Sequence, residues 1–491
     1  MLTIKRLLIA NRSEIAVRII QTCKSLGIET IAVFAPEDAT SPYVYLADKA
    51  IALTQSGIAS YLNAQELISI ALQENCDAIH PGYGFLSEKE HFAAQTIAAG
   101  LTWVGPRPEV ISMAGDKTKA RTLAQQLQVP ITPGKHFVIT EQDLAIAFAI
   151  SIGFPVMLKC PHGGGGKAMR IAKKQEQFID CWQAVVREGA HLFLSDEVIV
   201  EKYLENARHI EIQIAGDGKT AIHLFERDCS TQRRNQKIIE EAPSLIASTV
   251  KEKLYKESLK LATALSYDSV GTVEFLVTDK QIYFLEINTR LQVEHGVTEL
   301  ITGIDLVWLQ LFIASHKLLP ITQKEVQTRG HAIQARLYSE DPSNEFMPST
   351  GTISFVQFPN HPMVRIDHSL ESNTEIHPFF DPMIAKIIGF GLTRELARKN
   401  LITALAQTML FGVTTNIEFL QSILQSSFFI QGDVTTTLLS KDVVKKLCKE
   451  INTIENNSIS PELLEYLFAL QPPTPFQATV TKNQWKAKQW K

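Results

Sequence analysis

Short apolar runs alternate with amphipathic stretches of helical period over the first 113 residues of the chain. Strands and helices in such alternation are typical of a doubly wound parallel sheet. Gly27 directly follows the first amphipathic stretch, at a place where glycine commonly ends a helix. No G-x-G-x-x-G follows the first apolar run, which weakens a dinucleotide-binding interpretation. We predict strands at 6–10, 28–34, 77–80 and 102–105 and helices at 14–26, 64–74 and 88–99.

The pattern after residue 113 predicts further units, which make the chain a mixed α/β and α+β multidomain protein. One unit has the size of a small lid, with two short helices and apolar strands around a glycine run. A β-rich unit with acidic motifs follows it, and then strands at 352–358 and 383–389 precede helices at 394–410 and 416–425. Only one helix, from Pro461, is predicted in the tail. The predicted division is 1–113, 114–131, 132–202, 203–327, 328–440 and 441–491.

Polar side chains alternate strictly with other residues in the stretch E-I-N-T-R-L-Q-V-E. In an extended strand, alternate residues share one face. This face would carry two carboxylates and a guanidinium, which suits a metal ion beside an anion. The alternative is a solvated edge strand whose charges pair with one another. The residues expected on the shared face are Glu286, Asn288, Arg290, Gln292 and Glu294.

Four consecutive glycines follow an apolar run and lie between two lysines, in the stretch K-C-P-H-G-G-G-G-K-A-M. Glycines leave backbone N–H groups accessible, so such a loop can bind phosphate oxygens. The stretch is not a Walker P-loop, because Pro161 interrupts that pattern and Ala168 follows the second lysine. A flexible linker is the alternative, but Lys159 and Lys167 on either side favour phosphate binding.

Composition adds few constraints on function. The 491 residues are 45% hydrophobic, which is enough for the cores of several globular domains. A net charge of −4 without a dense basic block disfavours nucleic-acid binding. The six cysteines form neither a CxxC pair nor a zinc spacing, so we expect reduced thiols and a cytoplasmic protein. No apolar run reaches the roughly 20 residues that a membrane span needs.

Several long motifs make the chain resemble the biotin carboxylases of the ATP-grasp superfamily, from Ile4 to about Leu439. The resemblance implies an ATP-grasp fold with a Rossmann-like N-terminal domain, a connecting helix, a lid, a catalytic domain and a biotin carboxylase C-terminal domain, in the order of the divisions above. The motifs are N-R-S-E-I-A at Asn11, H-P-G-Y-G-F-L-S-E at His80, E-K-Y-L-E-N-A-R-H-I-E-I-Q at Glu201, E-R-D-C-S-T-Q-R-R-N-Q-K at Glu226 and E-I-N-T-R-L-Q-V-E-H at Glu286.

The resemblance also implies a cofactor site. ATP would phosphorylate bicarbonate, with Mg²⁺ or Mn²⁺ to offset the phosphate charge. Carboxylate and amide oxygens suit such ions, and the family pattern places the metal ligands at Glu274, Glu286 and Asn288. The nucleotide-binding residues that it implies are Lys117, Lys159, Gly163, Gly164, Gly165, Gly166, Lys167, Met169, Glu201, Lys202, His209, Gln232 and Asn235.

Four residues are expected to perform the chemistry. Glu294 would be the general base that deprotonates bicarbonate, with a pKa raised by its surroundings. Lys237 and Arg290 would hold the bicarbonate and carboxyphosphate anions. Arg336 resembles the family arginine that stabilises the biotin enolate, since a guanidinium suits a planar oxyanion.

Five positions depart from the family pattern. Ser13, Ala168 and Gly296 replace two glycines and a proline, Ala39 replaces an arginine and Asn235 replaces a histidine. If position 168 has a positive φ, alanine there costs about 1 kcal/mol. None of the five removes a proposed metal ligand, base or phosphate-binding lysine.

The resemblance further implies partners. No Met-Lys dipeptide occurs in the sequence, so biotin is expected on a separate biotin carboxyl carrier protein or domain, beside a carboxyltransferase subunit. The whole would be an acyl-CoA carboxylase acting on acetyl-, propionyl- or methylcrotonyl-CoA, and the chain itself a homodimer. Two alternatives stay open at this stage: another ATP-grasp carboxylate ligase, and a weakened nucleotide-binding scaffold subunit.

Overall fold

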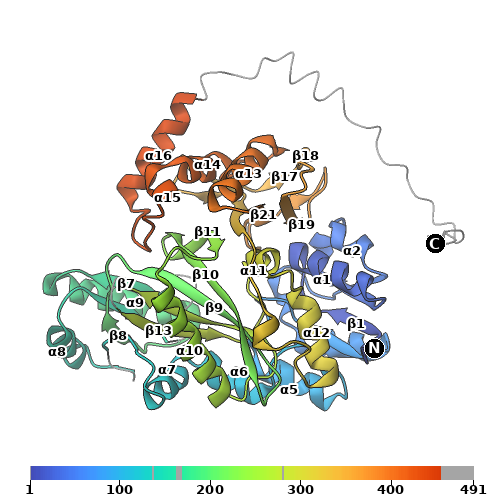
Figure 1. Cartoon of the computed structure of the whole chain (residues 1–491), viewed down its shortest axis with the longest axis horizontal. Helices are drawn as coiled ribbons and strands as arrows, with labels where there is room; N and C mark the ends of the chain where they lie inside the picture. Colours follow the sequence, from blue (N-terminus) through green and yellow to red (C-terminus); the bar gives the residue numbers. More distant parts are fainter. Residues whose placement is uncertain (1, 135–137, 162–167, 279–280, 455–491) are drawn as a thin grey trace, which may run out of the picture.

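The computed structural model describes residues 2–134, 138–161, 168–278 and 281–454, and it begins with a parallel sheet flanked by helices (Figure 1). The strand order is β3-β2-β1-β4-β5, and every neighbouring pair is parallel. Apolar side chains such as Leu8, Ile31 and Ile79 are fully buried, which agrees with the continuous apolar runs of the sequence. The prediction of a doubly wound sheet is confirmed. The strands are β1 (Arg6–Ile9), β2 (Glu29–Phe34), β3 (Lys49–Ala52), β4 (Ala78–His80) and β5 (Thr102–Trp103).

Two loops meet at the carboxyl edge of this sheet. One leads from β1 into helix α1 (Ser13–Ser25), and the other follows β4 towards α5 (Glu90–Ala98). Because parallel strands end at the same edge, the two family motifs in these loops become neighbours. Asn11 Nδ2 joins them by donating to the carbonyls of Pro81 at 2.7 Å and Tyr83 at 2.8 Å.

An eight-stranded sheet dominates the rest of the molecule, in the order β13-β12-β9-β10-β11-β14-β21-β19. The sequence suggests separate units at 203–327 and 328–440, but β11 pairs antiparallel with β14 and continues the sheet across that division. The backbone register sets Glu240 opposite Gln334. The strands are β9 (Arg208–Gly216), β10 (Ala221–Arg233), β11 (Gln236–Ala242), β12 (Val270–Val277), β13 (Ile282–Asn288), β14 (His331–Tyr338), β19 (Val364–His368) and β21 (Met383–Gly391).

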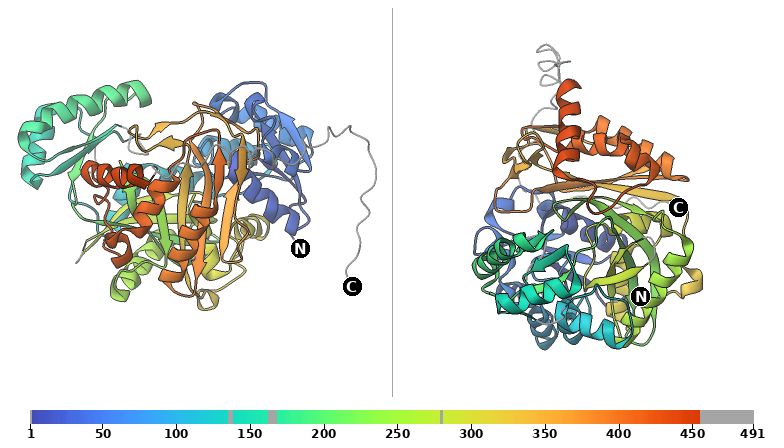
Figure 2. Two further views of the ribbon diagram at one scale, coloured as in Figure 1. Left: turned by 90° about the horizontal axis from the view of Figure 1, so that it is seen from above. Right: turned by 90° about the vertical axis from the view of Figure 1, so that its left-hand side faces the viewer.

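The predicted lid contains a three-stranded sheet in the order β7-β6-β8, with helices α8 (Gln142–Ile152) and α9 (Phe178–Phe193). It projects from one end of the molecule, on the left of the left-hand view in Figure 2. Its own small core includes Val156, Phe178 and Val185. The strands are β6 (Val156–Lys159), β7 (Met169–Ala172) and β8 (Ile199–Lys202), and the glycine run connects β6 to β7.

The C-terminal part packs helices α13 (Arg394–Gln407) and α14 (Ile417–Gln425) near the positions expected from the sequence. The single strand predicted at 352–358 is wrong, because it is divided into two short strands that pair with different partners. A helix that was not predicted, α16 (Lys441–Ile454), contacts α14 and buries Leu447. The helix predicted from Pro461 lies outside the described residues. The short strands are β17 (Gly351–Thr352) with β20 (Glu375–Ile376), and β18 (Phe355–Gln357) with β22 (Met409–Phe411).

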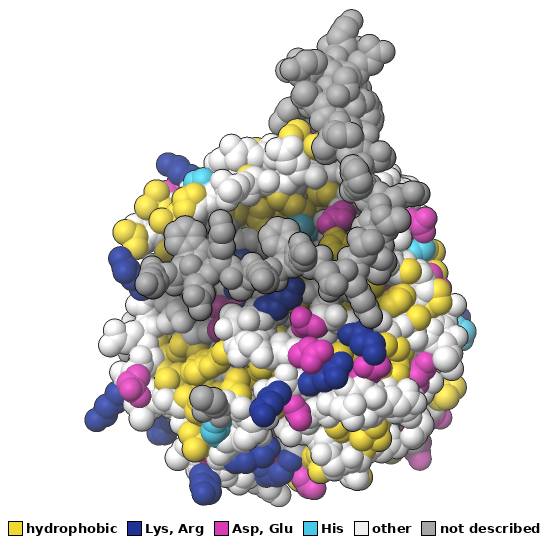
Figure 3. All heavy atoms as spheres, turned by 90° about the vertical axis from the view of Figure 1, so that its right-hand side faces the viewer, with side chains coloured by type: hydrophobic (Ala, Val, Ile, Leu, Met, Phe, Trp, Pro, Cys, Tyr) yellow, Lys and Arg dark blue, Asp and Glu magenta, His cyan; other side chains and the backbone are white. Residues whose placement is uncertain are grey.

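The mixture of charges on the surface and the apolar content of the helices agree with the composition of the sequence. On the face drawn in Figure 3, acidic and basic side chains lie intermixed between apolar ones. Within the described ranges, no single helix has both the length and the apolar composition to cross a membrane. Helices α11 (His295–Thr302) and α12 (Leu306–His316) meet that test only as a pair, and they are bent by 89° relative to each other. All six cysteines are free thiols.

A substitution at Gly389 tests the contact between α13 and the large sheet. A Cβ at this position would lie 2.5 Å from the carbonyl oxygen of Ala397 and 2.7 Å from the backbone nitrogen of Leu401. Because both atoms belong to the α13 backbone, the helix has to move. We expect Gly389→Ala to destabilise the protein by about 1–3 kcal/mol, measured as a lower midpoint of thermal unfolding.

The matched control is Gly115→Ala, where a Cβ meets nothing within 4 Å and alanine suits the helix. Equal midpoints for the two variants would contradict this account of the packing.

Candidate active site

A cavity of about 370 Å³ lies between the lid strands and strands β9 to β13. Every predicted site residue that the structure describes lines it, although these residues come from nine strands, a helix and two connecting segments. Gly163, Gly164, Gly165, Gly166 and Lys167 lie outside the described residues. The residues brought together are Lys117, Lys159, Met169, Glu201, Lys202, His209, Gln232, Asn235, Lys237, Glu274, Glu286, Asn288, Arg290, Glu294 and Arg336.

The three predicted metal ligands lie on adjacent strands. The antiparallel register of β12 and β13 sets Glu274 opposite Glu286, and Asn288 Nδ2 donates to Glu274 Oε1 at 2.8 Å. Burial alone would raise the pKa of Glu274, but Lys237 and His209 outweigh it and lower that pKa. An ionised carboxylate beside a second carboxylate and an amide oxygen is a ligand set that fits Mg²⁺.

His209 connects the metal ligands to the nucleotide side of the cavity. Its Nε2 lies 2.6 Å from Glu274 Oε2, and its Nδ1 lies 2.6 Å from the amide nitrogen of Gln232. Because the amide nitrogen can only donate, Nδ1 accepts and Nε2 carries the proton. His209, Glu211 and Glu274 also place one ligand atom each within 4.8 Å of one another. Lys237 Nζ already binds the carboxylates of Glu211 and Glu274, at 2.7 Å and 3.0 Å. The set with Glu211 therefore suits a metal ion less well than the predicted metal ligands do.

Glu201 is enclosed by cations instead of facing an open cavity. Lys159 Nζ lies 2.6 Å from its Oε1, and Arg121 Nη1 lies 2.9 Å from its Oε2. The sequence analysis missed Arg121, whose position in α7 (Lys117–Gln126) gives no local signal. Lys202 donates from Nζ to the carbonyls of Gly153 and Phe154, so it ties two lid segments together.

The strict alternation from Glu286 to Glu294 does not reflect one long strand, and this prediction is wrong. Strand β13 ends at Asn288, and Glu294 is the N-cap of α11. Arg290 turns back into the cavity because Glu88 binds its Nε at 3.0 Å and also accepts from the Thr289 backbone N–H at 3.1 Å. The side chains therefore converge through a bend and a turn. The E of the H-P-G-Y-G-F-L-S-E motif was the available signal for Glu88.

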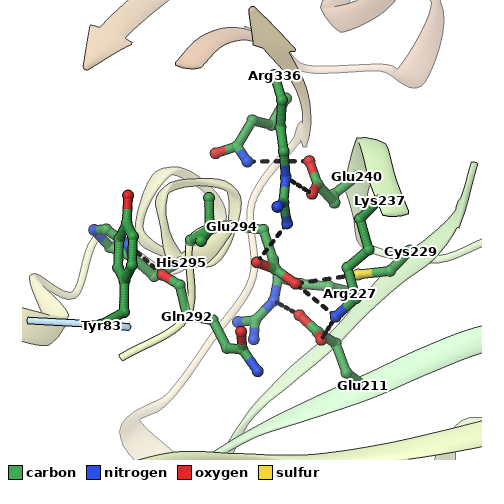
Figure 4. A network of polar contacts seen from close by, with 12 residues as sticks. Tyr83, Glu211, Arg227, Cys229, Lys237, Glu240, Gln292, Glu294, His295 and Arg336 are labelled. Carbon is green, nitrogen blue, oxygen red and sulfur yellow. Dashed lines mark hydrogen bonds and ion pairs between the residues drawn. The ribbon is translucent and has the colours of Figure 1, made fainter. Parts of the chain in front are cut away.

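Glu294 lies at the centre of the polar network drawn in Figure 4. Its carboxylate is completely buried, with Lys237 Nζ at 2.8 Å and Arg336 Nη2 at 3.0 Å. Burial alone would raise the pKa of Glu294, but Lys237, Arg336 and Arg227 outweigh it and lower the pKa well below its ordinary value. The expectation of a raised pKa is wrong for this state of the molecule, because three cations surround the carboxylate.

Further buried charges support these residues from behind. Arg227 binds Glu211 and donates to Gln213 at 2.6 Å, while Glu240 binds the Nε of Arg336 at 2.5 Å. The sequence analysis gave none of these a role, although Arg227 and Glu211 lie within the quoted family motifs. Alternation with His209 along β9 was the available signal for Glu211, whereas Arg227 does not alternate with Gln232 along β10.

The departures from the family pattern affect the backbone and leave the polar network intact. Ser13, Ala168 and Asn235 all have positive φ, at 58°, 51° and 64°. Asparagine tolerates this conformation better than most residues, whereas alanine is strained in it. A Cβ at Gly296 would lie 2.4 Å from Ile388 Cδ1, so the glycine allows that side chain to approach.

Ala168→Gly tests the strain at the base of the lid. Since φ at this position is 51°, glycine should relieve about 1 kcal/mol and raise the midpoint of thermal unfolding of the lid. Ala172→Gly, on the strand β7 that begins directly after Ala168 but without a positive φ, should lower that midpoint and serves as the control. Equal effects of the two glycines would show that the backbone at Ala168 is unstrained.

The pH dependence of the stability of the lid tests whether the cations around Glu201 keep it ionised. Lys159 and Arg121 outweigh burial and lower the pKa of Glu201 from 4.5 to about 2. The carboxylate therefore stabilises the fold above pH 4.5, and this contribution disappears as the pH falls toward 2.

We expect Glu201→Gln to lower the free energy of unfolding by about 3–5 kcal/mol at neutral pH. The measurement is a lower midpoint of thermal unfolding than in the parent. The difference in unfolding midpoint between the parent and Glu201→Gln should become smaller as the pH falls. The control is Glu205→Gln, at an exposed position nearby. A difference that stays constant with pH would mean that Glu201 is not held ionised by its neighbours.

Comparisons with known proteins agree with this geometry. Family models match at residues 3–111 (Biotin carboxylase, N-terminal domain), 116–322 (Carbamoyl-phosphate synthase L chain, ATP binding domain) and 334–441 (Biotin carboxylase C-terminal domain). A biotin carboxylase of Halalkalibacterium halodurans is 43% identical over 90% of this chain and 98% of its own. The mitochondrial propionyl-CoA carboxylase alpha chain of Sus scrofa is 43% identical over 89% of this chain and 61% of its own.

Solved structures show the same fold. The biotin carboxylase domain dimer of Hydrogenobacter thermophilus 2-oxoglutarate carboxylase, in complex with MgADP, ADP and bicarbonate, superposes with a TM-score of 0.87 at 39% identity. The match covers 90% of this chain and 98% of that one. A biotin carboxylase from Campylobacter jejuni in a β,γ-ATP complex gives 0.86 at 36% identity, over 89% and 99% of the two chains.

Proposed function

The chain belongs to the biotin carboxylase family, and we propose that it uses ATP and bicarbonate to carboxylate biotin on a separate carrier protein. The observation that carries this proposal is the position of Glu294 between Lys237 and Arg336, in the same cavity as Glu274, Glu286 and Asn288. A base, two anion-binding cations and a metal ligand set are the parts that phosphorylation of a small oxyanion requires.

The nucleotide is proposed to lie along the lid side of the cavity. Lys117 and Lys159 are the cations available there for its phosphates, and Lys117 Nζ lies 3.5 Å from Glu286 Oε2. Mg²⁺ held by Glu274, Glu286 and Asn288 would supply charge neutralisation for the transferring phosphoryl group. Lys159 lines the cavity while its Nζ is paired with Glu201 Oε1 at 2.6 Å.

Bicarbonate is proposed to bind between Lys237 and Arg290, next to Glu294. An incoming anion would share the hydrogen bonds that Lys237 now gives to Glu211, Glu274 and Glu294. Each carboxylate then loses part of its cationic neighbourhood, so the pKa of Glu294 rises when the substrate is present. In this way a carboxylate with a low pKa becomes a base that removes the bicarbonate proton.

The deprotonated oxygen would attack the γ-phosphorus of ATP, which forms carboxyphosphate and releases ADP. Carboxyphosphate would then yield CO₂ and phosphate. Arg336 faces the same carboxylate from β14, and its second partner Glu240 keeps the guanidinium plane aimed into the cavity. We assign it the stabilisation of the biotin enolate oxygen, which accepts from a guanidinium at short range.

The partners are also proposals. We propose a biotin carboxyl carrier protein or domain as one partner and a carboxyltransferase subunit, which selects the acyl-CoA, as the other. Acetyl-, propionyl- and methylcrotonyl-CoA are the candidates, with a role in fatty acid metabolism among the consequences. The dimer of the Hydrogenobacter thermophilus domain supports a homodimer, and the six free thiols support the reducing cytoplasm.

Turnover by the parent chain and by Glu294→Gln tests the proposal. Phosphate release from ATP should require bicarbonate and increase with free biotin, and it should fall about 100-fold or more in Glu294→Gln because the base is lost. Binding of ADP should stay within about threefold, since the nucleotide contacts lie elsewhere.

The control is Glu345→Gln, whose side chain is 84% exposed and does not line the cavity. No bicarbonate-dependent turnover in the parent would overturn the proposed function. Equal turnover in parent and Glu294→Gln would remove Glu294 as the base.

A further inference from the structure

Two motifs quoted from the N-terminal sheet have no part in the chemistry described above. They are N-R-S-E, which contains Asn11 and Glu14, and H-P-G-Y, which contains Tyr83. Both lie at the carboxyl edge of the parallel sheet, and neither Asn11 nor Glu14 lines the catalytic cavity. A third buried residue without a role, Lys386 of β21, brings them together with the catalytic loop.

Lys386 is completely buried, which is unusual for a lysine. It donates to the carbonyl of Val293 at 3.0 Å and lies 3.1 Å from Glu14 Oε2 and 3.5 Å from Asp367 Oδ2. A buried ammonium needs such partners, because an unpaired charge in the interior is very unfavourable. The three acceptors come from three separate parts of the fold: the catalytic loop, helix α1 and strand β19.

The Glu14 end of this cluster extends to Tyr83. The Tyr83 hydroxyl donates to Glu14 Oε1, and Asn11 Nδ2 holds the Tyr83 backbone carbonyl at 2.8 Å. The ring of Tyr83 lies 5.9 Å from Lys386 Nζ. Figure 4 draws Tyr83 on the opposite side of the Gln292–His295 segment from Lys237. The segment that presents Glu294 is therefore held from both sides.

Val293 directly precedes Glu294, so a fixed carbonyl at 293 restricts the position of the carboxylate. The backbone here has left strand β13 and makes no ladder hydrogen bonds. The next fixed point is His295, whose Nδ1 lies 2.7 Å from the carbonyl of Gln292. Gly296 follows, and glycine adds conformational freedom to the chain. The carbonyl of Val293 is thus the point where an external anchor has most effect.

We propose that Lys386 and Glu14 are positioning residues, which hold the Val293 carbonyl and thereby keep Glu294 in register with Lys237 and Arg336. The cluster of Glu14, Tyr83, Asp367 and Lys386 is the anchor. It acts through the backbone and touches neither nucleotide nor bicarbonate. The catalytic part of this inference rests on the proposed function, whereas the structural part does not.

Hydrogen exchange tests the structural part without any activity. In Lys386→Met the backbone amides of residues 289–296 should exchange at least about tenfold faster than in the parent, because the segment opens locally. Peptides from β9, which pairs on both sides, should keep their exchange rates. Unchanged exchange at 289–296, or an equal increase in both peptides, would overturn the anchor whatever the protein catalyses.

Turnover tests the catalytic part. Per nucleotide-binding site counted by ADP titration, Lys386→Met should lower kcat for bicarbonate-dependent biotin carboxylation about tenfold or more, with KM for ATP within about twofold. Lys386→Arg should recover most of the loss, because it keeps the cation. A residue that only fills space predicts the opposite order, since methionine matches the shape of the lysine stem more closely.

Glu14→Gln provides a second variant if Lys386→Met does not fold. It keeps an acceptor for the Tyr83 hydroxyl but removes the charge that faces Lys386, so a smaller loss in the same direction is expected. Measurements at about pH 8 keep Glu14 ionised in the parent, because burial raises its pKa to about 7. The matched control is Lys399→Met on the exposed side of α13, whose side chain is 65% exposed.

The outcomes separate the two proposals. A kcat per site within twofold of the parent in both Lys386→Met and Glu14→Gln would overturn the positioning role. A parent without bicarbonate-dependent turnover would overturn the proposed function, while the exchange measurement still decides whether the anchor exists.

Discussion

The burial of Glu294 is the constraint on which the rest of this active site depends. A carboxylate with no solvent exposure is tolerated only when cations of fixed geometry replace water. Lys237 and Arg336 supply that replacement at 2.8 Å and 3.0 Å, and each of them is in turn paired with a further buried carboxylate. Because every charge in this network needs its neighbours, the network specifies one arrangement of the surrounding strands and disfavours slipped or partly formed ones.

The continuity of the large sheet follows from the same requirement. Lys237 and Glu240 lie on β11, whereas Arg336 lies on β14, which belongs to the C-terminal part of the chain. Because β11 pairs directly with β14, Arg336 lies within hydrogen-bonding distance of Glu240. The family models divide the chain between residues 322 and 334. The active site takes residues from both sides of that division. Neither part alone would contain both Lys237 and Arg336.

The sequence predicts the local structure and the composition of the site better than it predicts how the site is assembled. Alternating apolar runs are sufficient for the parallel sheet, because period and turn residues are local properties. The convergence of Glu286, Arg290 and Glu294 was predicted correctly but for the wrong reason, since β13 ends at Asn288. What fixes Arg290 is Glu88, about two hundred residues away in the chain, and no periodicity reports such a contact. Helix α16 was missed although its apolar residues Val443, Val444, Leu447 and Cys448 recur at helical spacing and pack into the C-terminal core.

The departures from the family pattern acquire a physical meaning only in this context. Ser13 precedes Glu14 of the anchor, Ala168 lies two residues after the glycine run of the lid, and Gly296 lies two residues after Glu294. All three are backbone positions beside a functional side chain, and none supplies a ligand, base or cation. Two of them replace a residue that tolerates positive φ by one that does not, which strains the backbone by about 1 kcal/mol at each position. Such strain affects how firmly the backbone holds a site and does not alter the reactive groups themselves. The polar network therefore sets which reaction the protein performs, while these backbone positions set how often its parts are correctly placed.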